Sequence, residues 1–97
     1  MYGTIARIRL KPGMEQSVLK LVDQQVEDIP GNVGEYLFRM DSGANEYMLV
    51  AIFKDKESYF ANANSPEQDA RYRQLLALMD GEPQWHDGEI IHSYRAG

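Results

Sequence analysis

The most constraining feature of the chain is a run of seven residues without a polar position, from Tyr47 to Phe53. Successive side chains of a strand point to opposite faces of its sheet, so a half-solvated strand alternates apolar and polar residues. Here both sets are apolar, with Tyr47, Leu49, Ala51 and Phe53 on one face and Met48, Val50 and Ile52 on the other. Something must therefore cover both faces of the sheet that contains this strand.

The rest of the chain predicts four strands and three helices in the order β-α-β-β-α-α-β. Alternating and β-branched residues predict strands over residues 4–10, 33–41, 47–53 and 89–94. Apolar residues spaced three and four apart predict helices over residues 14–29, in a short stretch after residue 55, and from residue 66 to about residue 79. This order is that of the ferredoxin-like α+β fold, a four-stranded antiparallel sheet with its helices on one face.

Local signals set the boundaries of these elements. Ser65 at an N-cap, followed by Pro66 and an acid, is the strongest helix start, and Asp55 is a second N-cap. The segment 62–64, with two asparagines, is expected to interrupt the shorter helix before the longer one begins. Residues 85–88, which contain an Asp-Gly pair, are predicted to form a turn before the last strand.

Helices on one face leave the other face of the sheet bare, and the central strand makes that face apolar. An exposed apolar surface of this size is unusual for a monomer. A two-fold dimer that packs sheet against sheet would bury it, because such an interface is self-complementary. We therefore predict a homodimer through the sheet face, with Val50 among the residues that the partner covers.

Composition limits the classes of partner. The 97 residues suffice for one domain, and 15 acidic against 10 basic residues give a net charge of −5. A nucleic-acid partner would favour a basic surface, and the one local basic cluster, Arg7, Arg9 and Lys11, is typical of a polar stripe on a strand. The sequence therefore argues against nucleic-acid binding.

The absence of cysteine excludes disulfides, thiolate metal sites and a cysteine nucleophile. No apolar stretch approaches the roughly 20 residues of a membrane span, and no signal peptide is visible, so we expect a soluble, cytoplasmic protein without membrane contact. His86 and His92 would lie roughly 20 Å apart on a straight strand, at about 3.3 Å per residue, so no metal site is predicted.

Five segments carry a family resemblance: residues 2–7 (Tyr-Gly-Thr-Ile-Ala-Arg), 11–15 (Lys-Pro-Gly-Met-Glu), 52–57 (Ile-Phe-Lys-Asp-Lys-Glu), 65–67 (Ser-Pro-Glu) and 83–90 (Pro-Gln-Trp-His-Asp-Gly-Glu-Ile). Together they resemble proteins of the antibiotic biosynthesis monooxygenase family, which are dimeric α+β barrels. The resemblance implies one ferredoxin-like βαββααβ domain over residues 1–97, and a homodimer.

Members of this superfamily include oxygenases that oxidise aromatic polyketides or quinols without metal or flavin, and also haem-degrading enzymes. The haem-degrading pattern is not present. Ungapped placement from the Phe53–Lys54 junction puts Tyr72 at the position of the iron-ligating histidine and Asn62 near that of the tryptophan, and the strand over residues 4–10 lacks the asparagine. We therefore expect no haem and no other cofactor.

For the cofactor-free oxygenases, the resemblance implies a pocket between sheet and helices with aromatic walls and a few polar groups. The candidate walls are Tyr36, Phe38, Tyr59, Phe60, Tyr72 and Trp85, and the candidate polar groups are Asn62, Arg71, Arg73 and His86. Tyr72 and His86 are the candidates for catalysis, and the others, Arg73 apart, for substrate binding. Structural alternatives stay open: Tyr72 as a core aromatic, His86 as a surface histidine, and Trp85 as a plug between the last helix and the last strand.

Two functions of different classes fit these observations. The first is a cofactor-independent monooxygenase that acts on a small aromatic or quinone-like molecule. The second is a non-catalytic dimeric module that binds a ligand or partner, or serves as a stress-related scaffold. A void on which Tyr72, Trp85 and a polar group converge would favour the enzyme, whereas a space filled by Phe60, Leu75 and Met79 would favour the module.

Overall fold

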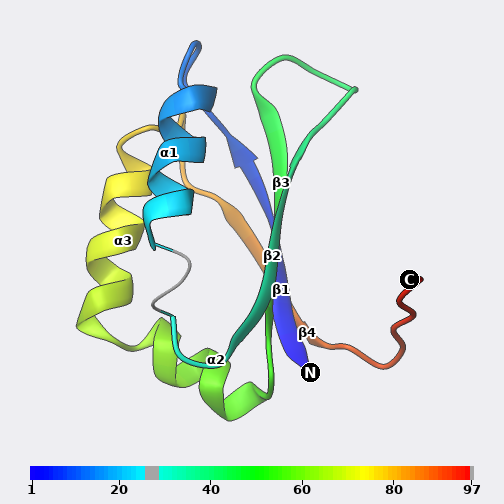
Figure 1. Cartoon of the computed structure of the whole chain (residues 1–97). Coiled ribbons are helices and arrows are strands. Elements are labelled where there is room, and N and C mark those ends of the chain that lie inside the picture. The colour runs from blue at the N-terminus through cyan, green and yellow to red at the C-terminus, as the bar shows by residue number, and fades with distance from the viewer. Residues whose placement is uncertain (26–28, 97) are drawn as a thin grey trace.

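The computed structural model describes residues 1–25 and 29–96, and within them a single sheet carries every helix on one face (Figure 1). The strands are β1 (Tyr2–Arg9), β2 (Asn32–Arg39), β3 (Glu46–Phe53) and β4 (Gln84–Glu89), and the helices are α1 (Glu15–Gln25), α2 (Lys56–Ala63) and α3 (Pro66–Leu76). All neighbouring strands are antiparallel, and their order is β2-β3-β1-β4. The predicted ferredoxin-like α+β fold is confirmed.

The core lies between the two central strands and the helices. β1 and β3 pair so that Ala6 faces Leu49 and Ile8 faces Tyr47, and all four side chains point toward the helices. The buried cluster consists of Ala6, Ile8, Leu10, Val18, Tyr47, Leu49 and Met79. Burial of a large aliphatic side chain stabilises the fold by about 1.5–3 kcal/mol, so this cluster holds the helices to the sheet.

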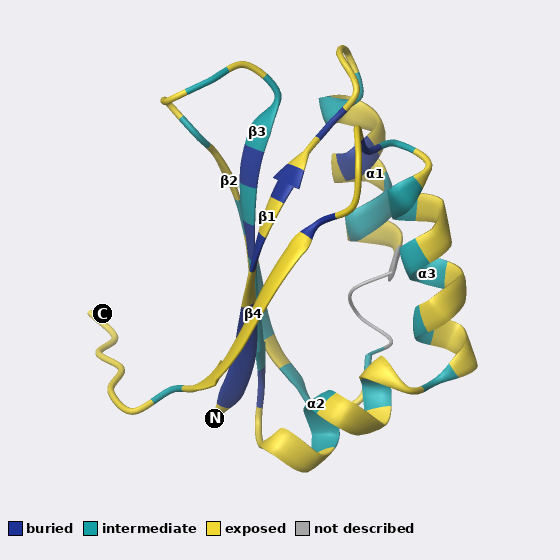
Figure 2. Ribbon diagram, turned by 180° about the vertical axis from the view of Figure 1, so that it is seen from behind, coloured by how far each residue is buried: buried dark blue, intermediate teal, exposed yellow. Residues whose placement is uncertain are grey.

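The opposite face of the sheet, which we call the open face, is apolar. Tyr36 (59% exposed), Phe38 (54%) and Ile5 (48%) lie on it, beside the outward side chains of the central strand, which include Val50. β3 is therefore apolar on both faces, as the seven-residue run predicts. No element of the described chain covers the open face, and β4 is exposed along its whole length (Figure 2).

The predicted helix starts are confirmed by their capping bonds. The Ser58 amide donates to Asp55 Oδ1 at 2.7 Å, and the Gln68 amide donates to Ser65 Oγ at 3.1 Å, with Pro66 in the first turn of α3. Each bond satisfies an amide that has no partner inside its helix. The turn before α2 and the turn before α3 therefore fix where these helices begin, and so how they lie over the sheet.

A charged contact holds α1 to the sheet. Arg39 Nε and Nη2 each donate to the Glu15 carboxylate at 2.6 Å, and the Tyr47 hydroxyl donates to the same carboxylate at 2.8 Å. The paired bonds from the guanidinium have the geometry that makes arginine–carboxylate pairs strong. They also hold the pKa of Glu15 well below its usual value, at about 2. Glu15 is therefore a charged link between the first turn of α1 and strands β2 and β3.

The predicted end of the chain is wrong. Residues 85–88 form most of β4 instead of a turn, and residues 91–96 form no strand. The reason is the length of β1, whose first residue, Tyr2, already pairs with Glu89. Beyond the last backbone bond, from the Ile90 amide to the Met1 carbonyl, the sheet offers no partner strand, so the chain leaves on the side away from the helices (Figure 1).

Two helix boundaries also differ from the prediction. α3 ends at Leu76 instead of Met79, because the backbone beyond it bonds to the end of β1: the Lys11 amide donates to the Leu78 carbonyl, and Asp80 donates to Arg9. α2 continues through residue 63, so the predicted interruption over residues 62–64 begins only at the last of these residues.

The first helix is also shorter than predicted. α1 is described over Glu15–Gln25, and Ile29, which was expected on its apolar face, is not helical. The predicted helical positions 26–28 lie outside the described residues.

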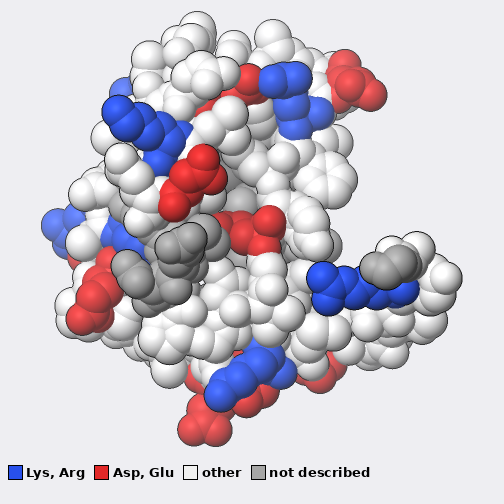
Figure 3. All heavy atoms as spheres, in the orientation of Figure 1, with Lys and Arg blue, Asp and Glu red and all other residues white. Residues whose placement is uncertain are grey.

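None of the described helices has the length and apolarity needed to cross a membrane. On the face seen in Figure 3, basic and acidic side chains are interspersed and separated by uncharged surface.

Candidate functional site

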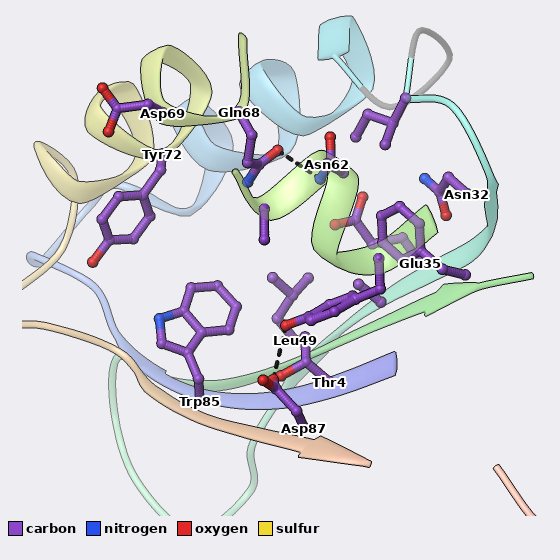
Figure 4. A pocket seen from close by; sticks show the side chains of 15 residues that line it. Thr4, Asn32, Glu35, Leu49, Asn62, Gln68, Asp69, Tyr72, Trp85 and Asp87 are labelled. Carbon is purple, nitrogen blue, oxygen red and sulfur yellow. Dashed lines mark hydrogen bonds between the residues drawn. The ribbon is translucent and has the colours of Figure 1, made fainter. Parts of the chain in front are cut away.

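A cavity of about 380 Å³ lies between the covered face of the sheet and helices α2 and α3 (Figure 4). Its volume is in the range of small-molecule sites, about 300–1,000 Å³. Its walls come from every strand of the described sheet and from the two helices. The lining residues are Thr4, Ile29, Asn32, Glu35, Leu49, Ala51, Phe53, Tyr59, Asn62, Ala63, Gln68, Asp69, Tyr72, Trp85 and Asp87.

Aromatic side chains form two opposite parts of the wall. Tyr72 of α3 and Trp85 of β4 approach each other with ring centroids 6.1 Å apart, and both point into the cavity (Figure 4). At the other side, the rings of Tyr59 and Phe53 meet edge to face at 5.4 Å. The pairing of Trp85 with Ala6 of β1 sets the direction of the indole, because it places this position of β4 on the covered face.

Three polar side chains form a connected network at the helical side. Arg71 donates from Nη2 to Asn62 Oδ1 at 2.9 Å and from Nε to Gln68 Oε1 at 3.1 Å, and Asn62 Nδ2 donates to Gln68 Oε1 at 3.2 Å. Each member is bonded to the other two, so the amide and guanidinium orientations are fixed together. The network joins the end of α2 to the first turns of α3 and gives the cavity a rigid polar edge.

Glu35 of β2 is a largely buried carboxyl group that lines the cavity. Burial raises its pKa, because a low-dielectric surrounding disfavours the charged form. It shares the covered face with Leu37, since alternate residues of β2 point the same way. A carboxyl group with a raised pKa in a cavity with aromatic walls is suited to accept a proton.

A second carboxylate, Asp87 of β4, accepts a hydrogen bond from the Tyr59 hydroxyl at 2.8 Å (Figure 4). Burial and this bond raise the pKa of Tyr59 to about 12, so its hydroxyl stays protonated at neutral pH. Burial also raises the pKa of Tyr72, whose hydroxyl therefore acts as a hydrogen-bond donor rather than as a phenolate. Asn32 also lines the cavity, and its Oδ1 is buried and has no hydrogen-bond partner in the described structure.

The structure brings some of the sequence-predicted site residues together and separates others. Tyr59, Asn62, Tyr72 and Trp85 line the cavity, and Arg71 borders it through its bonds to Asn62. The void on which Tyr72, Trp85 and polar groups converge is therefore present. The roles of these residues in binding or catalysis stay predictions.

Five other predicted residues lie elsewhere. Tyr36 and Phe38 are on the open face, and His86 is exposed on the same side, because it alternates with the inward Trp85. Phe60 packs on Tyr2 and Tyr59 without lining the cavity. Arg73, the remaining candidate, forms an exposed ion pair with Asp69 at 3.0 Å. The cavity of one chain therefore contains fewer of the predicted aromatic side chains and, in addition, carboxyl groups that were not predicted.

The residues that sequence reasoning missed are polar groups inside strands. Glu35 and Asp87 lie on the covered face, and Asn32 begins β2. A signal for Glu35 existed: the alternation that places Leu37 inward also places Glu35 inward, where an acid is out of pattern. No such signal existed for Asp87, because the predicted turn over residues 85–88 removed it from the sheet.

Other sites are less suited to an aromatic ligand. A groove of about 660 Å³ lies outside α2 and α3, and its lining, which includes Lys54, Ser58 and Glu67, contains no aromatic side chain. Within the described residues, no group of three His, Cys, Asp or Glu side chains is placed to hold a metal ion.

The sequence profile described as antibiotic biosynthesis monooxygenase matches residues 1–74. The chain belongs to this family. No curated protein sequence matches it.

Solved structures of this family have the same fold. The chain is similar to a mutant of SnoaB, a cofactor-independent oxygenase from Streptomyces nogalater (18% identity, TM-score 0.77, 95% of this chain and 94% of that chain). It is also similar to a Bordetella bronchiseptica protein that carries the family description (20%, 0.78, 94% and 97%) and to a conserved protein from Methanosarcina mazei (16%, 0.76, 90% and 89%). At these identities the likeness shows the fold, and the site must supply the argument for function.

Proposed function

We propose that the protein is a cofactor-independent monooxygenase that binds a small aromatic, quinol-like molecule between the sheet and helices α2 and α3. The observation that carries the proposal is the cavity of about 380 Å³, whose lining combines Tyr72 and Trp85 with the carboxyl group of Glu35. Flat apolar walls suit an aromatic ring, and a carboxyl group with a raised pKa suits removal of a weakly acidic proton. Family membership and the likeness to SnoaB support the reaction class.

The proposed reaction replaces the two hydrogens that one ring carbon carries in the keto tautomer of the substrate by one oxygen atom of O₂. Glu35 accepts a proton and leaves an electron-rich substrate anion, which O₂ then oxidises. The second oxygen atom leaves as water together with the two hydrogens, so the reaction needs no other reductant. The protein contributes a base, a fixed orientation of the ring and exclusion of water around the anion.

The polar groups around the cavity have separate tasks in this scheme. Tyr59 stays protonated because its pKa is raised to about 12, so it holds Asp87 and does not compete for the substrate proton. Tyr72 donates its hydroxyl proton toward a substrate oxygen. Arg71 fixes the amide groups of Asn62 and Gln68, which line the cavity and can bond to a substrate oxygen.

The second part of the proposal is a homodimer through the open face. Ile5, Tyr36 and Phe38 expose large apolar surfaces there, and Val50 lies between them through its pairing with Ile5 and Tyr36. An isologous contact would bury all of them at once. The family resemblance supports this arrangement, since it is that of a dimeric α+β barrel.

Native mass spectrometry with oxygen-uptake measurements tests the function. A dimer with a copurified aromatic adduct, and uptake of O₂ on addition of quinols, is the expected result. Binding of the quinol without any O₂ uptake would replace the monooxygenase by the alternative, a ligand-binding module. Failure of the cavity to bind any aromatic compound would overturn the monooxygenase and leave only a partner-binding or scaffold module.

Glu35→Gln tests the proton acceptor. It keeps the size of the side chain and removes the base, so kcat should fall by about 10²–10⁴-fold. In the wild-type protein, kcat/KM should rise with pH through the raised pKa of Glu35, because the base must be ionised, and this limb should disappear in the variant. Glu57→Gln, at an exposed position of α2, is the matched control and should retain activity. Full activity of Glu35→Gln would remove Glu35 from the mechanism.

A further inference from the structure

A smaller pocket of about 70 Å³ adjoins the main cavity. Six residues border both spaces: Ile29, Glu35, Leu49, Gln68, Tyr72 and Trp85. Of the aliphatic residues, Val22 of α1 and Leu75 of α3 border the smaller space alone. Both of these aliphatic residues also pack against the buried core. This smaller space, which we call the side pocket, is therefore a mainly apolar recess that shares a boundary with the proposed substrate site.

The volume of the side pocket limits what it can hold. An apolar cavity of roughly 150 Å³ binds benzene or xenon. The side pocket, at about 70 Å³, is half that size and too small for an aromatic ring. A diatomic gas fits, because a small molecule needs much less space: a water molecule, for example, occupies about 30 Å³ in the liquid. Transfer of such an apolar molecule from water to aliphatic walls is favourable.

One cation borders the side pocket. Arg71 is held by two neutral amide oxygens, Asn62 Oδ1 at 2.9 Å and Gln68 Oε1 at 3.1 Å. These bonds use two of its five N–H donors, and none of the ion pairs among the described residues involves it. An anion formed in the side pocket would therefore meet a positive charge that is already oriented and has no carboxylate partner. Glu35 also borders this pocket, and it is neutral once it has accepted the substrate proton, so it does not repel the anion.

We propose that the side pocket is the dioxygen site of this oxygenase and that Arg71 stabilises the superoxide formed there. The inference rests on the function proposed above and adds the position of the second substrate. The aromatic molecule occupies the main cavity, and dioxygen occupies the recess beside it, so the two meet along the shared wall of Leu49, Tyr72 and Trp85.

The electrons balance within the two substrates. The aromatic anion, formed when Glu35 accepts its proton, transfers one electron to dioxygen and becomes a radical, while dioxygen becomes superoxide. The radical and superoxide then form a carbon–oxygen bond, and protonation gives a hydroperoxide. Loss of water from this hydroperoxide, with the remaining hydrogen of the same carbon, leaves the carbonyl product. The positive charge of Arg71 favours the electron transfer because it stabilises the superoxide and not the neutral dioxygen.

Xenon pressurisation of crystals of the wild-type protein tests the site without turnover. The expected result is a xenon atom in the side pocket, against Val22 and Leu75. A xenon atom in the main cavity alone, or none in either space, would overturn the inference and leave the proposed function standing. Xenon in the side pocket of a protein that oxidises no quinol would overturn the oxidative role instead.

Leu75→Phe tests the role of the side pocket in the reaction, because the larger side chain fills the space. The KM for O₂ should rise by at least about fivefold, while the Kd of the aromatic ligand, measured without oxygen, should stay unchanged. Leu76→Phe is the matched control, since it makes the same change at the next residue of α3, which borders neither pocket. An unchanged KM for O₂ in Leu75→Phe, or an equal rise in both variants, would overturn the inference.

Arg71→Gln tests the charge. The variant should lower kcat by about tenfold with little change in the KM for O₂, since neutral dioxygen binds through the apolar walls. Arg71→Lys, which retains the charge, should recover part of kcat, whereas loss of the fixed orientation alone would affect both variants equally. Equal kcat values in the glutamine and lysine variants would remove the proposed role of the charge.

Discussion

On the covered face of the sheet, Glu35 and Asp87 bring carboxyl groups into a cavity, whereas on the open face Tyr36 and Phe38 expose aromatic rings. One step along β2 separates Glu35 from Tyr36, because adjacent residues of a strand point in opposite directions. This distribution is the reverse of that in a monomer that has no ligand, where acids face water and rings face the core. The difference supports both parts of the proposal, a small molecule bound on the covered face and a second protein surface packed on the open face.

The same contrast is repeated within β4. Trp85 and Asp87 point toward the helices and line the cavity, and His86 between them points away. The pairing of β4 with β1 decides which side chain can touch a ligand, since a slip of one residue would exchange them. Position in the sheet, and not residue type, therefore separates the candidate catalytic residues from the others.

Val50→Asp on the open face tests the dimer interface and has the largest expected effect. In the proposed dimer the change places an unpaired carboxylate against apolar surface, which costs about 4 kcal/mol. The dimer Kd should therefore increase by about 1,000-fold or more. Analytical ultracentrifugation measures the change, with circular dichroism to show that the chain stays folded. Ser42→Asp, in the exposed turn between β2 and β3, is the control and should remain dimeric. A folded Val50→Asp dimer would refute an interface on the open face.

The neighbouring residue should give the opposite result. Leu49→Ala removes a buried side chain on the covered face, which should lower the free energy of unfolding by about 3 kcal/mol through lost burial and the space left behind. The Kd of the dimer should change little at temperatures where the variant is folded. Urea unfolding and ultracentrifugation separate the two effects. A Leu49→Ala variant that dissociates without loss of unfolding free energy would mean that the two faces are not independent.

Patterns in the sequence were sufficient for the fold. The seven apolar residues from Tyr47 to Phe53, the serine N-cap at residue 65 and the alternation of helical and strand periods predict the architecture, because each is set by short-range geometry. The end of the chain could not be predicted in this way. Residues 89–94 have the composition of a strand, but their pairing depends on how far β1 extends. The first residue of β1, Tyr2, already pairs with Glu89, so the residues beyond Glu89 have no partner in β1. Strand pairing is a long-range property that local composition does not contain.

The candidate site was predicted only in part. Tyr72, Trp85 and Asn62 line the cavity. Their types suit a pocket wall, but residue type alone does not decide which face of the sheet or helix a side chain occupies. Tyr36 was expected in the same wall, yet it lies on the open face because its ring is out of phase with the inward residues of β2. Glu35 was missed because its raised pKa comes from its burial, which the residue type does not reveal.

Tyr72→Phe tests the proposed role of one hydroxyl group on the covered face. Removal of one hydroxyl that donates to the substrate should lower the rate of quinol oxidation by about tenfold, the value of one hydrogen bond of about 1.4 kcal/mol. The melting temperature should stay nearly the same, because the ring continues to pack on Trp85. Tyr94→Phe, in the exposed C-terminal segment, is the matched control. An unchanged rate in Tyr72→Phe would remove its hydroxyl from the mechanism.

The smallest expected effect concerns the link between α1 and the sheet, which belongs to neither partner surface. The pKa of Glu15 is lowered to about 2 by bonds from Arg39 and Tyr47, so its stabilisation of the fold is complete above the unfolded pKa of 4.5 and is lost as the pH falls toward 2.

Glu15→Gln should therefore flatten the fall in urea midpoint between pH 5 and pH 2, relative to the wild-type protein. The contact is largely solvated, so the difference should be modest and should shrink at high salt. Glu57→Gln removes an exposed carboxyl of α2 and controls for the loss of one charge. Equal pH dependence in the wild-type protein and Glu15→Gln would mean that the Arg39 contact does not persist in solution. Dimerisation should be unaffected, because Glu15 lies on the helical side of the sheet, away from the open face.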